Sequence, residues 1–92
     1  MYRFGRMGYI VGRMTKEDDA LQDAVIDQLN AEIGATGTNM KDLAKAIGRP
    51  YDSTRNYLRK ERALPFGVFF EICTALRIPA DEVIRRARQR MP

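Results

Sequence analysis

Histidine is absent from the 92 residues, and cysteine occurs once, as Cys73. A single cysteine excludes an intramolecular disulfide, and we expect Cys73 to be a small buried apolar residue. Without histidine, the common histidine-containing zinc sites, the Ser-His-Asp triad and histidine acid–base chemistry are excluded. The sequence also has no paired-carboxylate, glycine-rich phosphate-binding or metal-ligand motif. It therefore predicts a protein that is not an enzyme and needs no metal or cofactor.

Long hydrophobic runs are absent as well. No apolar run approaches the roughly 18 residues of a membrane-spanning helix, and residues 1–14 have no continuous apolar stretch typical of a signal peptide. We therefore expect a cytoplasmic protein with no membrane partner and no small-molecule ligand. A chain of 92 residues that is 45% hydrophobic and 30% charged predicts one compact folded domain.

Charge is distributed unevenly along the chain, which carries a formal net charge of +4. Residues 1–14 contain three arginines and no acid, residues 15–35 contain six acids and one lysine, and residues 36–92 contain twelve bases and six acids. A basic surface favours a polyanion such as DNA as the partner, although a mixed solvated surface explains the same composition.

The hydrophobic pattern predicts an all-α domain over residues 15–92, preceded by a flexible basic arm over residues 1–14. Apolar residues recur at helical spacing in five segments, and no segment alternates as a strand would. The expected helices span about 15–34, 39–48, 50–60 and 65–76, with a fifth that starts at 79 and frays in its basic tail from residue 85.

Helix start and stop signals support these boundaries. Thr15 and Asn39 are expected N-caps, because their side-chain oxygens can accept hydrogen bonds from the free N–H groups of the first turn. Gly48 suits the left-handed conformation that ends a helix. Pro50 cannot continue that helix but is well placed at the start of the next one.

Two segments, NMKDLAKAIGRPYDSTRNYLRKERALP and LPFGVFFEICTALRIPADEVI, resemble the Xre/Cro family of helix-turn-helix domains. Ala44 matches the small residue midway along the first motif helix, Gly48 matches the turn, and the pair Tyr57 and Leu58 matches the core positions of the second helix. The resemblance covers about residues 17–85. It implies a compact lambda-repressor-like fold that binds double-stranded DNA sequence-specifically. It also implies a transcriptional repressor of the phage or prophage kind, such as an immunity repressor, in a bacterial cell or a phage-infected host.

Two features depart from the family's pattern. Thr54 stands where the family usually has isoleucine or valine, so its hydroxyl needs a partner such as the carbonyl one turn back. Arg49 and Pro50 replace a more typical apolar–polar turn, and we expect this change to alter the angle between the two motif helices slightly.

A recognition helix presents hydrogen-bonding side chains near the end that enters the major groove, where arginine pairs with guanine and asparagine with adenine. The expected base contacts are Tyr51, Asp52, Ser53, Arg55 and Asn56. Flanking positions are expected to contact phosphates through side chains or through the free N–H groups that begin the preceding helix. These positions are Met40, Lys41, Lys45, Arg59, Lys60 and Arg62.

Several charged positions have more than one interpretation. Asp52 can accept a hydrogen bond from cytosine, orient Arg55 at i, i+3 spacing, or interact only with the helix dipole. Either a solvated terminus or further phosphate contacts are expected of the tail arginines, Arg85, Arg86, Arg88 and Arg90. The basic arm either is disordered or reaches an adjacent minor groove through Arg3, Arg6 and Arg13.

The aromatic cluster Phe66, Phe69 and Phe70 is expected to belong to the core or to a dimer contact rather than to a base-stacking platform. Three such residues cannot share one helical stripe, so one of them should stay partly exposed. We accordingly expect a weak homodimer through the last two helices, with a monomer on an asymmetric site as the alternative. The alternative function is an antitoxin or adaptor that uses the same fold chiefly for protein–protein contact.

Overall fold

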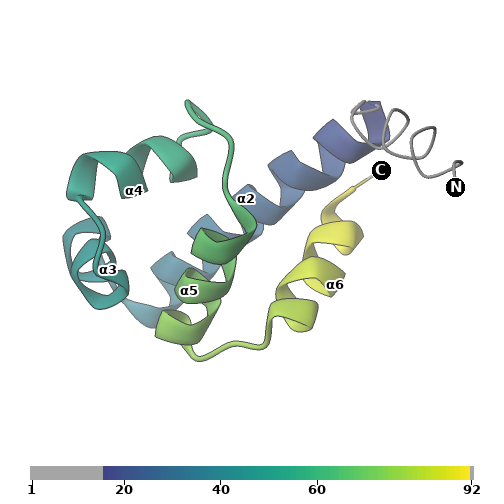
Figure 1. Ribbon diagram of the computed structural model, residues 1–92. Helices are drawn as coiled ribbons and strands as arrows, with labels where there is room; N and C mark the ends of the chain where they lie inside the picture. The colour runs from purple at the N-terminus through teal and green to yellow at the C-terminus, as the bar shows by residue number, and fades with distance from the viewer. Residues whose placement is uncertain (1–15, 92) are drawn as a thin grey trace, which may run out of the picture.

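Five α-helices occur in residues 16–91, the residues that the computed structural model describes (Figure 1). These helices are α2 (Lys16–Thr36), α3 (Met40–Ile47), α4 (Tyr51–Leu58), α5 (Phe66–Leu76) and α6 (Ala80–Arg90). No strand occurs among the described residues. The predicted all-α class is therefore confirmed for this part of the chain. The predicted arm, with Arg3, Arg6 and Arg13, and the predicted cap Thr15 lie outside it.

The long helix α2 supports three of the other four helices. It contacts α4, α5 and α6, and α6 returns alongside it (Figure 1). Helix α3 packs against α4 and α5, and α5 also contacts α6. Among the described helices, α4 contacts only α2 and α3. One side of α4 is therefore not covered by any of the other described helices.

The core draws on all five helices. Leu29 of α2, Ile72 of α5 and Val83 of α6 have no exposed surface, and Leu43 of α3 and Leu58 of α4 are also buried. Burial of each such side chain contributes roughly 1.5–3 kcal/mol through removal of apolar surface from water. The short helices α3 and α4 are thus held by the same core as the longer ones.

The exposure of the α5 side chains corrects one prediction. Phe69 and Cys73 are buried, and burial raises the pKa of the Cys73 thiol to about 11. Phe66 and Phe70 are 72% and 46% exposed, so two of the three phenylalanines face solvent instead of one. Their spacing of four residues places them on the same stripe of the helix, where their rings meet edge to face with centroids 4.9 Å apart.

Helix α2 is longer than the sequence predicted. The expected end at Gly34 is wrong, because the helix continues to Thr36 and the left-handed residue that follows it is Gly37, with a φ of 76°. The Thr36 hydroxyl donates to the Ile33 carbonyl at 3.0 Å and so satisfies one of the last carbonyls of the helix.

The tail also differs from its prediction, because α6 remains helical to Arg90 instead of fraying from residue 85. Arg86 forms an ion pair with Glu32 at 2.6 Å, and Arg90 donates to Gln28 at 2.6 Å, so both are bound to α2 rather than forming a solvated terminus. Burial by itself would raise the pKa of Glu32. Hydrogen bonds from Arg86 and Gln28, together with the charges of Arg86 and Arg90, outweigh this effect and lower the pKa. Arg85 pairs with Glu82 within α6.

Helix α5 ends at a residue other than glycine that adopts the left-handed backbone conformation. Arg77 has a φ of 58°, its N–H donates to the Thr74 carbonyl at 3.1 Å, and the Ile78 N–H donates to the Cys73 carbonyl at 3.0 Å. These two bonds form a Schellman motif, in which glycine is usual at the left-handed position. A residue with a Cβ atom costs roughly 1–2 kcal/mol in this conformation.

Replacement of this residue by glycine should therefore stabilise the fold. We expect Arg77→Gly to raise the free energy of unfolding by about 0.5–1 kcal/mol, because relief of the strain exceeds the added entropy of the unfolded chain. Urea denaturation measures this difference. The matched control is Arg88→Gly within α6, which should lower stability by about 1 kcal/mol. A loss of stability in both variants would show that Arg77 is not strained.

Candidate nucleic-acid interface

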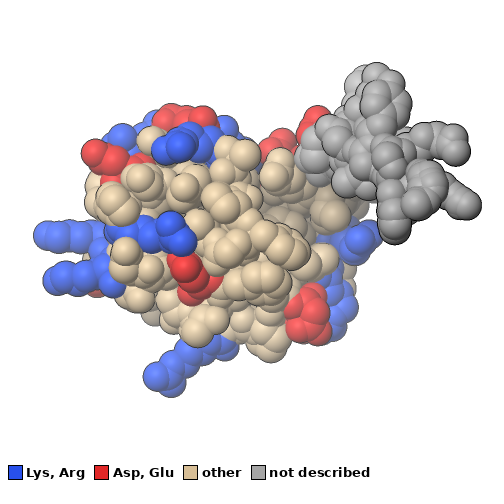
Figure 2. Space-filling view, in the orientation of Figure 1, with Lys and Arg blue, Asp and Glu red and all other residues tan. Residues whose placement is uncertain are grey.

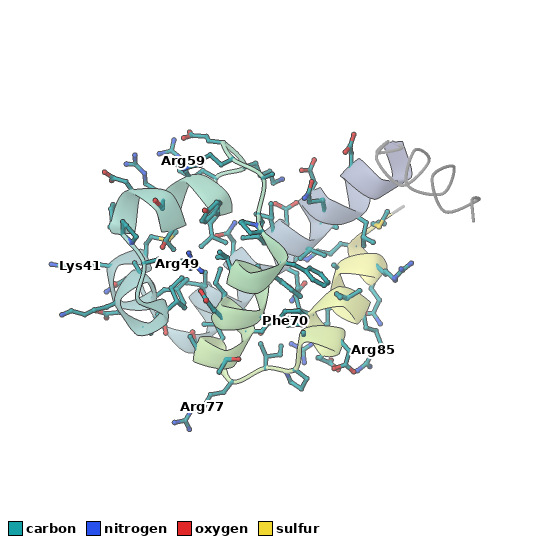
Figure 3. The ribbon with its side chains drawn as sticks, viewed as in Figure 1. Lys41, Arg49, Arg59, Phe70, Arg77 and Arg85 are labelled. Atoms are coloured by element: carbon teal, nitrogen blue, oxygen red, sulfur yellow. The ribbon has the colours of Figure 1, made fainter. Side chains whose placement is uncertain are left out.

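Helix α3 begins with the predicted cap. The Asn39 side chain accepts a hydrogen bond from the Asp42 N–H at 2.7 Å. On the inner side of the helix, Leu43 and Ala44 are buried. Lys41 is exposed and extends away from the body of the molecule at the end that α3 forms (Figure 3).

The turn after α3 adopts the left-handed conformation that the sequence predicted. Gly48 has a φ of 69° and a ψ of 32°. Its N–H donates to the Lys45 carbonyl at 3.2 Å, and the Arg49 N–H donates to the Ala44 carbonyl at 3.0 Å. This Schellman pair ends α3 and fixes the direction in which the chain leaves it. Pro50, with a φ of −59°, then precedes the first turn of α4.

Arg49 connects this turn to α5. Its Nε donates to Glu71 Oε1 at 2.7 Å and its Nη2 donates to Oε2 at 3.1 Å. The hydrogen bonds from Arg49 lower the pKa of the Glu71 carboxyl, and those to Glu71 raise the pKa of the guanidinium. The sequence analysis treated Arg49 only as a departure from the family's turn. The pairing had no sequence signal, because the partners are 22 residues apart.

The inner side of α4 is held at both ends. Thr54 is fully buried and its hydroxyl donates to the Pro50 carbonyl at 3.0 Å, which confirms the partner predicted for it. Leu58 is buried in the core. At the other end, the Asn30 amide of α2 donates to the Leu58 carbonyl at 3.0 Å. This contact satisfies a free carbonyl of the last turn, and the sequence analysis did not identify Asn30.

All five predicted base-contacting residues lie on α4, a helix of eight residues. Tyr51 and Asp52 are exposed, and Ser53, Arg55 and Asn56 are half-buried. None of them belongs to the buried core. The uncovered side of α4 thus carries a phenol, a carboxylate, a guanidinium and an amide, which are groups that can hydrogen-bond to base edges.

Arg55 contacts an aromatic ring rather than an acid. Its Cζ atom lies 5.9 Å from the centroid of the Tyr51 ring. Within residues 16–91 it forms no ion pair with Asp52, so the interpretation that Asp52 orients Arg55 is wrong. The Nε atom of Arg55 is buried and has no hydrogen-bond partner among the described residues.

The predicted phosphate contacts differ in whether an acidic or aromatic partner holds them. Lys60 pairs with Asp27 of α2 at 3.0 Å, and Arg59 lies 3.7 Å from Glu61. Arg62 lies over the Tyr57 ring, with its Cζ 5.8 Å from the ring centroid. The two lysines of α3, Lys41 and Lys45, are exposed and take part in no salt bridge within the described part of the chain.

The start of α3 and the start of α4 lie next to each other. Asn39, Met40, Lys41 and Tyr51 together line one shallow depression. Cationic side chains extend from this end of the molecule, whereas much of the face over α5 is uncharged (Figure 2). The free N–H groups of two helix N-termini and a lysine therefore lie beside the proposed base-reading residues, which is an arrangement that suits a phosphate group.

Among the side chains that the structure describes, those of residues 19–91, no cluster of three or more acidic, cysteine or histidine residues is placed to hold a metal ion. None of the helices described is at once long enough and apolar enough to cross a membrane. Comparison of the chain with family models, with curated proteins and with solved structures found no match.

The Arg49–Glu71 pair should make stability depend on pH. The folded-state pKa of Glu71 is below its ordinary value of 4.5, so the pair stabilises the fold fully above that value. The contribution is lost as the pH falls through the lower folded-state pKa. We expect Glu71→Gln to be less stable than the parent at pH 7 and to approach the parent's stability as the pH falls below 4.5, in thermal unfolding followed by circular dichroism. A difference that does not shrink as the pH is lowered below 4.5 would contradict this account of Glu71.

Proposed function

We propose that the chain is a sequence-specific DNA-binding protein of the lambda-repressor-like helix-turn-helix type, which places α4 in the major groove and acts as a transcriptional repressor. The observation that supports this proposal most directly is the uncovered side of α4, where Tyr51, Asp52, Arg55 and Asn56 lie outside the core while Thr54 faces inward. The sequence resemblance to the Xre/Cro family supports the repressor role of the phage or prophage kind.

Direct readout of bases requires that α4 is held in a fixed position. The Schellman bonds at Gly48 and the bidentate pair of Arg49 hold its beginning, and Asn30 holds its end. A bidentate contact between a side chain and a base contributes about 1–3 kcal/mol of discrimination, and only when its geometry is maintained. Anchors at both ends of so short a helix favour such discrimination over non-specific binding.

The phosphate contacts that we propose are centred on α3. Lys41 and Lys45 have no acidic partner among the side chains described, those of residues 19–91, whereas Lys60 would have to leave Asp27 before it could bind a phosphate. Each phosphate neutralised by a lysine releases counterions, which makes the affinity depend on salt concentration.

Selection of bound duplexes from a random DNA pool tests the proposed function. We expect enrichment of a defined sequence that binds at least about 10³-fold more tightly than random DNA in fluorescence anisotropy at a fixed salt concentration. A chain that enriches no sequence, or that binds selected and random duplexes equally, would contradict sequence-specific binding.

Variants of the α3 lysines should separate phosphate contacts from base contacts. We expect Lys41→Ala to weaken binding to all duplexes alike and to reduce the slope of log affinity against log salt by about 0.9, the value for one phosphate contact. The control is Arg77→Ala, which removes one positive charge at the lower edge of the molecule, away from Lys41 (Figure 3), and should leave the slope unchanged. Equal slopes in the two variants would show that α3 does not face the phosphates.

We also propose a weak homodimer through the exposed stripe of α5. Phe66 and Phe70 present two apolar rings that the described residues leave largely uncovered. Contiguous exposed apolar surface of this kind marks contact sites, and two rings are far less than the roughly 800 Å² that each partner buries in a stable complex. The dimer should therefore form at high concentration in solution and more readily when two copies lie on one duplex.

Sedimentation equilibrium over a range of concentrations measures this association. We expect Phe70→Ser to raise the dimer dissociation constant about tenfold, equivalent to about 1.4 kcal/mol. Tyr51→Ser is the matched control, because Tyr51 is an aromatic residue with the same 46% exposure but lies on α4. A parent chain that stays monomeric at millimolar concentration would contradict the dimer, and these phenylalanines would then support the adaptor function.

A further inference from the structure

We infer that Tyr51 is a positioning residue rather than a base-reading one: its ring holds the Arg55 guanidinium so that Arg55 reads a guanine. This inference rests on the proposed function and adds to it the base that α4 selects. Tyr51 and Arg55 were both predicted to contact bases, and the contact between their side chains suggests different roles for them.

The side chains of Tyr51 and Arg55 are in contact. Tyr51 and Arg55 are four residues apart on α4, so their side chains lie one above the other on the helix surface. The guanidinium carbon lies 5.9 Å from the ring centroid, within the range of a cation–π interaction. An unsupported arginine samples many rotamers, and a stacked planar guanidinium samples fewer. The ring therefore reduces the entropy that Arg55 loses on binding.

The hydrogen-bonding edge that remains on Arg55 is formed by its Nη1 and Nη2 groups. The Nε atom of Arg55 is buried and has no partner among the described residues. Among residues 19–91, whose side chains the structure describes, Arg55 has no ion pair, so none of their acids competes for its Nη1 and Nη2 groups. Two parallel N–H donors match the O6 and N7 acceptors of guanine in the major groove, and no other base presents that pair.

The hydroxyl of Tyr51 distinguishes positioning from base reading. The role that we infer requires only the face of the ring, because the ring quadrupole attracts the guanidinium. A phenylalanine should perform this role, whereas a residue that reads a base through its hydroxyl should fail without it. The two roles therefore make opposite predictions for the same substitution.

The experiment measures base preference position by position. The duplex that the parent chain selects from a random pool is varied at each base pair, and dissociation constants are measured at one salt concentration for the parent and its variants. We expect a guanine at one position to be preferred at least tenfold by the parent. In Arg55→Ala and in Tyr51→Ala the preference for guanine at this position should fall below threefold. Tyr51→Phe should keep the full preference. Preferences at the other positions should remain in all three variants.

A double variant and a conservative variant strengthen the test. Tyr51→Ala combined with Arg55→Ala should lose no more discrimination than Arg55→Ala alone, because the two residues act as one unit. Arg55→Lys should lose most of the preference, because an ammonium group lacks the planar pair of donors. Thermal unfolding of each variant shows whether the fold is intact, and the 46% exposure of Tyr51 predicts little change.

The outcomes that overturn the inference differ from those that overturn the proposed function. Loss of preference at a different base pair in Tyr51→Ala, or the same loss in Tyr51→Phe, would show that Tyr51 itself reads a base. Equal weakening on every duplex in Tyr51→Ala would show that its role is only structural. A parent chain without any preferred duplex would overturn the proposed function and this inference with it.

Discussion

The left-handed residue between α3 and α4 is the constraint on which the rest of the structure depends. Gly48 ends α3 with two backbone hydrogen bonds, and only three residues, 48–50, separate the two helices. A connection this short leaves α4 few directions that also bury Thr54 and Leu58 in the core. The pair between Arg49 and Glu71 then attaches the same turn to α5. The side of α4 that remains uncovered therefore follows from this turn together with the positions of Thr54 and Leu58 on the helix.

The remaining helices hold α3, α4 and the turn between them in place. Helix α2 contacts α4 directly, donates from Asn30 to its last turn and pairs Asp27 with Lys60 just beyond it. Helix α6 is bound along α2 through Glu32 and Arg86. The acidic character of α2 therefore holds basic segments in place, instead of forming only a solvated surface. Among the described cations near the proposed site, Lys41, Lys45, Arg55 and Arg62 have no acidic partner, and the two arginines lie against tyrosine rings.

The sequence was enough to predict the features of the fold that depend on residues close together in the chain. The Asn39 cap, the Gly48 turn and the bond from Thr54 to the carbonyl one turn back all follow from residue type and spacing. Contacts between distant residues had no such signal, since Asn30 lies 28 residues from Leu58 and Arg49 lies 22 from Glu71. The candidate base-reading residues were found because they share one helix. The contact between Tyr51 and Arg55, and the partners that hold the basic residues after α4, depend on packing that the sequence pattern does not contain.

We propose that the surface formed by α3 and α4 binds DNA, and amide chemical-shift mapping identifies the surface that a duplex contacts. The measurement is a titration of ¹⁵N-labelled full-length chain with a duplex selected from a random pool. The account predicts that the largest shifts occur in residues 40–45 and 51–59, with small changes in residues 80–90. Shifts centred on α6 or on the outer face of α2, with α4 unaffected, would contradict it.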